Sequence, residues 1–242
     1  MSQTIAVFGA GPGLGQAVAR RYGQAGYEVV LVARRPAPLE RFAEELAADG
    51  ITAHVVTGDL SDSDAVPALA DRIRAKTGPL NAFYYGPAPA DPGFVPAATL
   101  RPEQVRELMP KTLYTLLALV REFLPAMLDQ GGGAILSAQG AAALRGLPRM
   151  SGWPPALAAQ RNYLQSVAEE VAGKGVYVGM LFVGTLIVGS AAAEHRVVDA
   201  AGVPAAERPS ADPADLAELL WSMHQTGKPR ETLVPEGFFD GL

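Results

Sequence analysis

The sequence predicts an α/β fold, a doubly wound parallel sheet flanked by helices on both faces. Short apolar segments alternate with segments of helical periodicity along the whole chain. A glycine-rich turn over residues 9–15, called the glycine turn below, follows the first apolar segment directly. The length of 242 residues suits one such domain over residues 1–242, because open α/β sheets accommodate this length around one core.

Each element has its own local signal. The first strand, residues 5–9, is apolar and breaks on glycine, and helical spacing begins again over residues 15–24. Further strands are expected over residues 28–33, 52–57, 80–85, 134–138, 176–183 and 232–235. Further helices are expected over residues 39–49, 61–76, 102–130 with an interruption near Pro110, 154–174, and from a cap at Asp212 to about residue 225. Such a sheet places its ligand crevice beyond the carboxyl ends of the strands.

Two segments do not fit the alternation. Proline and glycine crowd residues 86–93, which predicts a surface loop. Residues 189–210 are rich in alanine and contain Gly202, Pro204 and Pro209. Because they follow the strand expected to flank the ligand, we interpret them as a candidate substrate lid.

Composition excludes several classes of protein. The chain is 49% hydrophobic and 19% charged, which is typical of globular proteins, and no apolar run is long enough to cross a bilayer. We therefore expect a soluble, cytoplasmic protein, since no secretory signal is visible. A net charge of −5 without a basic tract argues against nucleic acid as a partner. The chain has no cysteine, and His54, His195 and His224 are scattered, so no metal site is expected.

The glycine turn predicts a Rossmann-like dinucleotide site. Glycines at Gly9, Gly13 and Gly15 would allow a tight turn, close approach of backbone N–H groups to a pyrophosphate, and close helix packing. A glycine-rich turn that binds nothing is the alternative, but the position between a strand and a helix favours binding. The expected cofactor residues here and at later strand ends are Gly9, Gly11, Pro12, Gly13, Leu14, Gly15, Asp59, Leu60, Gly86 and Gly184.

The end of the second strand indicates which dinucleotide is bound. An acidic residue there would accept the ribose hydroxyls of NAD, whereas this chain has Arg34 and Arg35. Guanidinium groups bind a 2′-phosphate, so we expect NADP(H) in preference to NAD(H). The alternative is that both arginines are a solvated start of the next helix.

Several motifs together resemble the short-chain dehydrogenase/reductase family over essentially the whole chain. They are the GxxxGxG spacing of the glycine turn, the Gly58-Asp59-Leu60 step, Leu124-Pro125-Ala126-Met127, Leu144-Arg145-Gly146-Leu147-Pro148 and Val183-Gly184. The family carries a catalytic asparagine, serine, tyrosine and lysine. Matching the motifs places these four at Thr112, Gly140, Trp153 and Leu157, called the family positions below. The family's Asn-Asn-Ala-Gly is likewise replaced by Tyr85-Gly86-Pro87-Ala88.

These differences have a chemical consequence. Carbonyl reduction needs a proton at oxygen, which in the family comes from the tyrosine beside the lysine. An indole N–H is no practical proton source and leucine carries no charge, so the resemblance implies an atypical active site. Replacement donors near the crevice would be Tyr85, our first choice, followed by Ser137 and Tyr114. Each also has a structural explanation, since a tyrosine at a strand end is often a core ring.

Three functions are compatible with this reading. The first is an atypical NADP(H)-dependent oxidoreductase for a hydrophobic carbonyl or enone compound with a non-standard proton donor, since Trp153 and neighbouring apolar residues predict a hydrophobic pocket. The second is a cofactor-binding enzyme without redox chemistry, such as a cyclase, isomerase or dehydratase. The third is a non-catalytic NADP-binding or scaffold protein. A hydrophobic small molecule and a homodimer or homotetramer are the expected partners.

Overall fold

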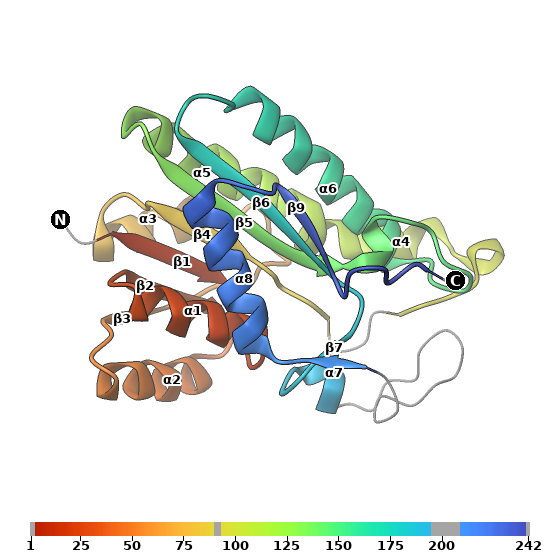
Figure 1. Ribbon diagram of the computed structural model, residues 1–242, viewed down its shortest axis with the longest axis horizontal. Coiled ribbons are helices and arrows are strands. Elements are labelled where there is room, and N and C mark those ends of the chain that lie inside the picture. Colours follow the sequence, from red (N-terminus) through yellow and green to blue (C-terminus); the bar gives the residue numbers. More distant parts are fainter. Residues whose placement is uncertain (1–2, 90–92, 195–208, 241–242) are drawn as a thin grey trace.

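A seven-stranded parallel sheet forms the centre of the computed structural model, which describes residues 3–89, 93–194 and 209–240 (Figure 1). The strand order β3-β2-β1-β4-β5-β6-β9 reverses direction beside β1, as in a doubly wound sheet. The strands are β1 Thr4–Phe8, β2 Glu28–Ala33, β3 Ala53–Thr57, β4 Ala82–Tyr85, β5 Gly133–Gly140, β6 Val176–Val183 and β9 Glu231–Val234. The predicted fold class is confirmed.

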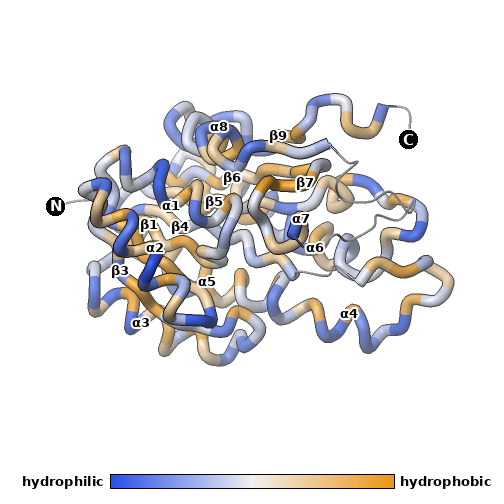
Figure 2. The backbone as a smooth tube through the Cα atoms, turned by 90° about the horizontal axis from the view of Figure 1, so that it is seen from below, coloured by the Kyte–Doolittle hydropathy of each residue, from blue (hydrophilic) through white to orange (hydrophobic). Residues whose placement is uncertain are grey.

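Helices cover both faces of the sheet because alternate strand residues point to opposite sides. Phe8 and Phe83 lie on the face covered by α3 Val66–Thr77, α5 Thr115–Asp129 and α6 Trp153–Glu170. Val7 and Tyr84 lie on the face covered by three other helices. These are α1 Leu14–Gln24, α2 Pro36–Ala48 and α8 Pro213–Thr226. Each face therefore has its own apolar core, and hydrophobic colour runs through the strands in Figure 2.

The long helix predicted over residues 102–130 is interrupted near Pro110, as expected. It divides into α4 Pro102–Met109, the π-helical segment η2 Pro110–Tyr114 and α5. Proline has no N–H to continue the α-helical pattern, and the Thr115 N–H bonds to the Pro110 carbonyl five residues back. Thr112 lies within this π-helical turn and is its buried residue.

The predicted start of the helix over residues 61–76 was wrong, because α3 begins at Val66. The Asp59 carboxylate accepts the Ser61 N–H, and the Asp62 carboxylate accepts the N–H groups of Asp64 and Ala65. These side-chain bonds stabilise turns in place of the first helical turn.

Five short elements of the described part of the chain were not predicted. They are η1 Ala97–Thr99, η3 Ala141–Ala143, α7 Ala191–Glu194 and the pair of two-residue strands β7 Leu186–Ile187 and β8 Ser210–Ala211. The last three fall within or beside the candidate lid over residues 189–210. Most of that segment, residues 195–208, lies outside the described residues.

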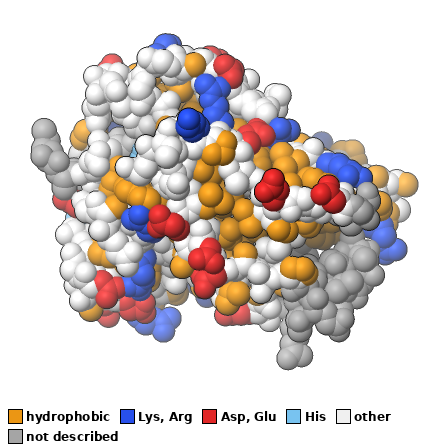
Figure 3. Space-filling view, viewed as in Figure 1, with side chains coloured by type: hydrophobic (Ala, Val, Ile, Leu, Met, Phe, Trp, Pro, Cys, Tyr) orange, Lys and Arg blue, Asp and Glu red, His pale blue; other side chains and the backbone are white. Residues whose placement is uncertain are grey.

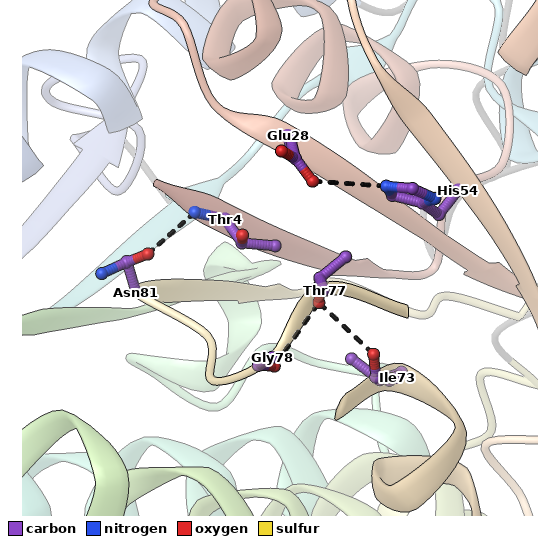
Figure 4. A network of polar contacts seen from close by, with 7 residues as sticks. All are labelled: Thr4, Glu28, His54, Ile73, Thr77, Gly78 and Asn81. Carbon is purple, nitrogen blue, oxygen red and sulfur yellow. Dashed lines mark hydrogen bonds and ion pairs between the residues drawn. The ribbon is translucent and has the colours of Figure 1, made fainter. Parts of the chain in front are cut away.

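Polar side chains close the amino-terminal end of the sheet (Figure 4). The Asn81 side-chain oxygen accepts the Thr4 N–H at 2.8 Å, and His54 lies 3.4 Å from the Glu28 carboxylate. These contacts satisfy groups where the parallel strands begin. The opposite end of the sheet is therefore the one left for a ligand.

The described surface mixes charges of both signs, as the face in Figure 3 shows. Within residues 3–89, 93–194 and 209–240, no helix has the combined length and apolar character needed to span a bilayer. The same residues hold no cluster of three or more histidine, aspartate or glutamate side chains suited to a metal ion.

Candidate active site

A cavity of about 430 Å³ opens at the carboxyl ends of the strands. The turns after β1, β2 and β4 supply Gly9, Arg34 and Gly86, and the ends of β5 and β6 supply Gly140 and Val183. This is the crevice that the order of a doubly wound parallel sheet predicts. The site can therefore be divided into the part beside the glycine turn and the part beside α6.

The glycine turn packs so closely that a side chain would not fit. A Cβ on Gly15 would lie 2.1 Å from the Gly9 carbonyl oxygen. Gly13 has a φ of +89° and precedes α1 without a side-chain cap, which leaves backbone N–H groups available at the start of the helix. The turn thus forms a backbone cradle at a helix N-terminus, the arrangement that binds a phosphate group.

Cationic side chains border the cavity at the end of β2. Arg34 and Arg35 line it, are exposed, and form no ion pair within the described part of the chain. Lys111 of η2 lines it too. Burial, with a smaller effect of the Arg34 charge, lowers the pKa of Lys111, while Asp59 opposes this. Three cations and one carboxylate therefore lie near one another beyond β2 and β3.

The four family positions meet at the other part of the cavity. Gly140, Trp153 and Leu157 line it, and a Cβ on Gly140 would lie 3.8 Å from the Leu157 side chain. The Trp153 indole N–H donates to the Thr112 hydroxyl at 3.1 Å, so Thr112 joins the group without lining the cavity. Residues from η2, β5 and α6 are thus brought together as the family resemblance implies.

Tyr85 lines the cavity, but its hydroxyl already has a partner. The ring is 1% exposed, and the hydroxyl donates to the Lys111 carbonyl. Burial raises the pKa of Tyr85 far above its usual value. A general acid works best with a pKa near the working pH, so this hydroxyl is a poor proton donor. The contact holds β4 against η2.

The other two predicted donors do not line the cavity. Ser137 is fully buried within β5, where its Oγ accepts the Gln160 amide N–H at 2.9 Å. Tyr114 is 44% exposed at the end of η2. Neither position favours direct proton delivery to a molecule in the cavity.

Most of the predicted cofactor residues line the cavity. Gly13 and Gly184 are the two that do not line the cavity, and both pack behind it, against Ser190 and Phe238 respectively. The residues that do line it are Gly9, Gly11, Pro12, Leu14, Gly15, Arg34, Arg35, Asp59, Leu60 and Gly86. The chain's residues thus fit a dinucleotide, with a backbone cradle for the pyrophosphate and arginines for a 2′-phosphate.

Lys111, Gln160, Thr185 and Ser190 are among the lining residues that were not predicted from the sequence. Lys111 lies in the π-helical turn η2, and no sequence pattern predicted that turn. Gln160 follows Leu157 by three residues on α6, so helical spacing could have found it. Thr185 and Ser190 lie in irregular chain after β6, where periodicity carries no signal.

Comparison with known families agrees with the fold and the cavity. The family described as short chain dehydrogenase matches residues 3–196, and the chain belongs to this family. A short chain dehydrogenase of Pseudocercospora fijiensis is 26% identical over 72% of this chain and 56% of its own length. The 1-deoxy-11-beta-hydroxypentalenate dehydrogenase of Streptomyces arenae is 32% identical over 56% of this chain and 49% of its own length. The chain spans about half the length of these curated relatives.

Solved structures share the whole architecture. A metagenomic short-chain oxidoreductase in complex with NADP has a TM-score of 0.76 and 25% identity, with 96% of both chains covered. A variant of actinorhodin polyketide ketoreductase with NADPH has a TM-score of 0.86 and 21% identity, covering 99% of this chain and 98% of the other. The second likeness supports the fold alone.

Proposed function

We propose that this protein is an NADP(H)-dependent oxidoreductase that acts on a hydrophobic carbonyl or enone compound, with a proton source outside the four family positions. One observation carries the proposal. A single cavity joins the backbone cradle and arginines at one part to the apolar surfaces of Trp153 and Leu157 at the other. The membership of an oxidoreductase family and the NADP complex of a similar structure support it.

Residues of the first part would hold the cofactor. The glycine turn would bind the pyrophosphate through backbone N–H groups, and Arg34 and Arg35 would bind the 2′-phosphate. Lys111 adds a third positive charge nearby. When bound, NADPH supplies a hydride to an electrophilic carbon of the substrate.

Residues of the second part would shape the pocket without donating a proton. The single polar hydrogen of the Trp153 side chain is bonded to Thr112, and Leu157 and Gly140 carry no titratable group. Tyr85 is bonded to a backbone carbonyl. We therefore assign the proton to a water molecule or to a hydroxyl of the substrate itself, which is a revision of our first choice, Tyr85.

The walls of this part favour a flat, apolar substrate. Trp153, Leu157, Leu186 and Ile187 all line the cavity. Apolar pockets with few polar groups bind hydrophobic ligands and fix their orientation through those few groups.

The predicted cytoplasmic location and the predicted homodimer or homotetramer stay predictions.

A second candidate is a cofactor-binding enzyme without redox chemistry, such as a cyclase, isomerase or dehydratase. The observation that favours it is the same pair, Trp153 and Leu157, because orientation of a hydrophobic substrate needs no proton from those positions. A non-catalytic NADP-binding protein would have the same cradle but no substrate turnover.

Titration calorimetry with NADPH, followed by absorbance assays of NADPH consumption with ketones, quinones and activated enones, tests the proposal. Binding together with consumption of NADPH supports the oxidoreductase. Binding without consumption would favour the second candidate. Absence of NADPH binding would contradict the proposal and the second candidate alike.

A further inference from the structure

Three buried polar side chains form what we call the amide cluster, Ser137, Gln139 and Gln160. Their exposed fractions are 0%, 4% and 3%. Ser137 and Gln139 lie on one face of β5, and Gln160 reaches them from α6. Gln139 and Gln160 also line the cavity, whereas Ser137 lies behind them. The cluster is therefore a polar floor beside the apolar surfaces of Trp153 and Leu157.

The hydrogen bonds of the amide cluster are incomplete. The Gln160 amide N–H lies 2.9 Å from Ser137 Oγ, and the Gln139 amide nitrogen lies 3.5 Å from the same oxygen. Gln139 Oε1 has no hydrogen-bond partner within the described residues, although it is buried. Buried polar atoms almost always have partners, so an unpartnered one on a residue that lines the cavity points to a ligand there.

The two amides compete for one hydroxyl. When both donate to Ser137 Oγ, the Ser137 proton has no acceptor within the cluster, and Gln139 Oε1 has no donor. An amide presents one acceptor and one donor end, and its orientation is set by the surrounding network. Turning the Gln139 amide over lets its oxygen accept the Ser137 proton and leaves its NH₂ group unpartnered instead. In either orientation one polar end of Gln139 remains unpartnered.

We propose that Gln139 is the residue that binds the carbonyl oxygen of the substrate, and that Ser137 and Gln160 position its amide. Gln160 donates to Ser137, Ser137 donates to Gln139 Oε1, and Gln139 Nε2 donates to the carbonyl oxygen. This assignment rests on the proposed function, because it names the group that would orient and polarise the carbonyl compound there.

The same amide also fits the reduced form of the substrate. A carbonyl oxygen needs a donor, and the corresponding alcohol can offer its own O–H to an acceptor. Rotation of the Gln139 amide presents Nε2 to the first and Oε1 to the second. A glutamine is therefore better matched to a carbonyl and alcohol pair than a side chain that can only accept.

The test compares two probes of matched shape, methyl naphthyl ketone and isopropenylnaphthalene, which has a methylene group in place of the oxygen. Affinities are measured by fluorescence titration for wild type, Gln139→Met and Thr232→Val, all saturated with NADP⁺, which cannot deliver hydride. Thr232 is the matched control, because its hydroxyl is also buried and unpartnered within the described residues but does not line the cavity.

Wild type should bind the ketone more tightly than the hydrocarbon. Gln139→Met should weaken ketone binding about fivefold, the effect of one neutral hydrogen bond, and change hydrocarbon binding less than about twofold. Thr232→Val should change neither. The infrared carbonyl stretch of the bound ketone should lie at lower frequency in wild type than in Gln139→Met.

A second variant keeps the proposal testable if Gln139→Met does not fold. Ser137→Ala leaves Gln139 in place but removes the hydroxyl that orients it, and should weaken ketone binding about twofold to threefold. Equal ketone affinity in wild type and these variants, or no preference of wild type for the ketone, would each overturn the assignment. Thr185→Val is measured in the same way, because Thr185 Oγ1 is also buried and unpartnered within the described residues and Thr185 lines the cavity. Loss of ketone affinity in Thr185→Val instead of Gln139→Met would likewise overturn the assignment.

Failure of the proposed function gives a different result. If wild type does not bind NADP⁺ but still prefers the ketone through Gln139, the assignment stands and the oxidoreductase proposal fails. If NADPH binds and is consumed in the absorbance assays but the ketone preference is absent, the assignment of Gln139 fails and the oxidoreductase proposal stands.

Discussion

The two parts of the cavity are built in different ways. Beside the glycine turn, the structure leaves so little room that a single Cβ on Gly15 would lie 2.1 Å from a backbone oxygen. Beside α6, three of the four family positions line the cavity, and Gly140 among them has an ordinary φ of −68° with its nearest obstacle 3.8 Å away. The first part is made by the path of the backbone, and the second by replaceable side chains.

This difference is a physical reason for our proposal that one part keeps the family pattern while the other departs from it. A change in the glycine turn would shift α1 and the sheet, which costs folding free energy. A change at Trp153 or Leu157 alters the pocket wall and leaves the strand order untouched. We therefore expect substitutions in the first part to affect both folding and binding, and substitutions in the second to affect chemistry.

The largest effect is expected from Gly15→Val. The added side chain would collide with the Gly9 carbonyl and displace the start of α1. We expect a loss of about 3 kcal/mol of stability and a loss of about hundredfold or more in NADPH affinity, measured by thermal unfolding and calorimetry. Gly146→Ala is the control, because a Cβ there would meet nothing within 4 Å. Unchanged NADPH binding in Gly15→Val would remove the glycine turn from the site.

The next effect tests the second part by restoring the family's residues. The triple variant Gly140→Ser, Trp153→Tyr and Leu157→Lys should raise the rate of ketone reduction at least about tenfold, since a positioned general acid contributes at least that much. NADPH affinity should stay within about threefold of wild type. If the rate does not rise, the shape of the pocket rather than the missing donor limits the reaction.

A smaller effect separates the two dinucleotides. Arg34→Ala should weaken NADPH binding about tenfold, because one charge-assisted contact to the 2′-phosphate is lost. NADH affinity should hardly change, so the ratio of the two dissociation constants is the decisive quantity. Arg72→Ala, a change at an exposed arginine of α3 outside the cavity, is the control. Equal losses for NADPH and NADH would contradict the phosphate assignment.

The smallest effect is expected from Tyr85→Phe. The hydroxyl bonds to the Lys111 carbonyl, so its removal should lower stability by about 1 kcal/mol and leave turnover within about twofold of wild type. Chemical denaturation and steady-state kinetics measure the two quantities. A fall in turnover of about hundredfold at unchanged stability would instead make Tyr85 the proton donor.

The fold was predictable because its signals are local. Apolar strands, helical spacing and glycine or proline breaks recur along the chain, and β2 and β6 begin and end at the predicted residues. The start of α3 was not predictable from periodicity, because Asp59 and Asp62 bond to backbone N–H groups and stabilise turns. Local polar contacts therefore decided the boundary that the apolar pattern missed.

The site was predictable only in part. Gly9 and Gly15 of the backbone motif line the same cavity as Gly140, Trp153 and Leu157, which the motif matching had selected. Hydrogen-bond partners were beyond reach, because they join segments far apart in the chain. The bond from Tyr85 to Lys111 spans 26 residues, and the bond from Gln160 to Ser137 spans 23. The sequence therefore carries no sign that the Tyr85 hydroxyl is bonded to the Lys111 carbonyl.

A crystal structure with NADP⁺ and methyl naphthyl ketone would show whether the cofactor and the ketone bind in the two parts of the cavity as proposed. We expect the 2′-phosphate beside Arg34 and Arg35, the nicotinamide near Gly140 and Leu157, and no tyrosine hydroxyl within hydrogen-bond distance of the ketone oxygen. A 2′-phosphate away from both arginines, or the Tyr85 hydroxyl bonded to the ketone oxygen, would contradict it.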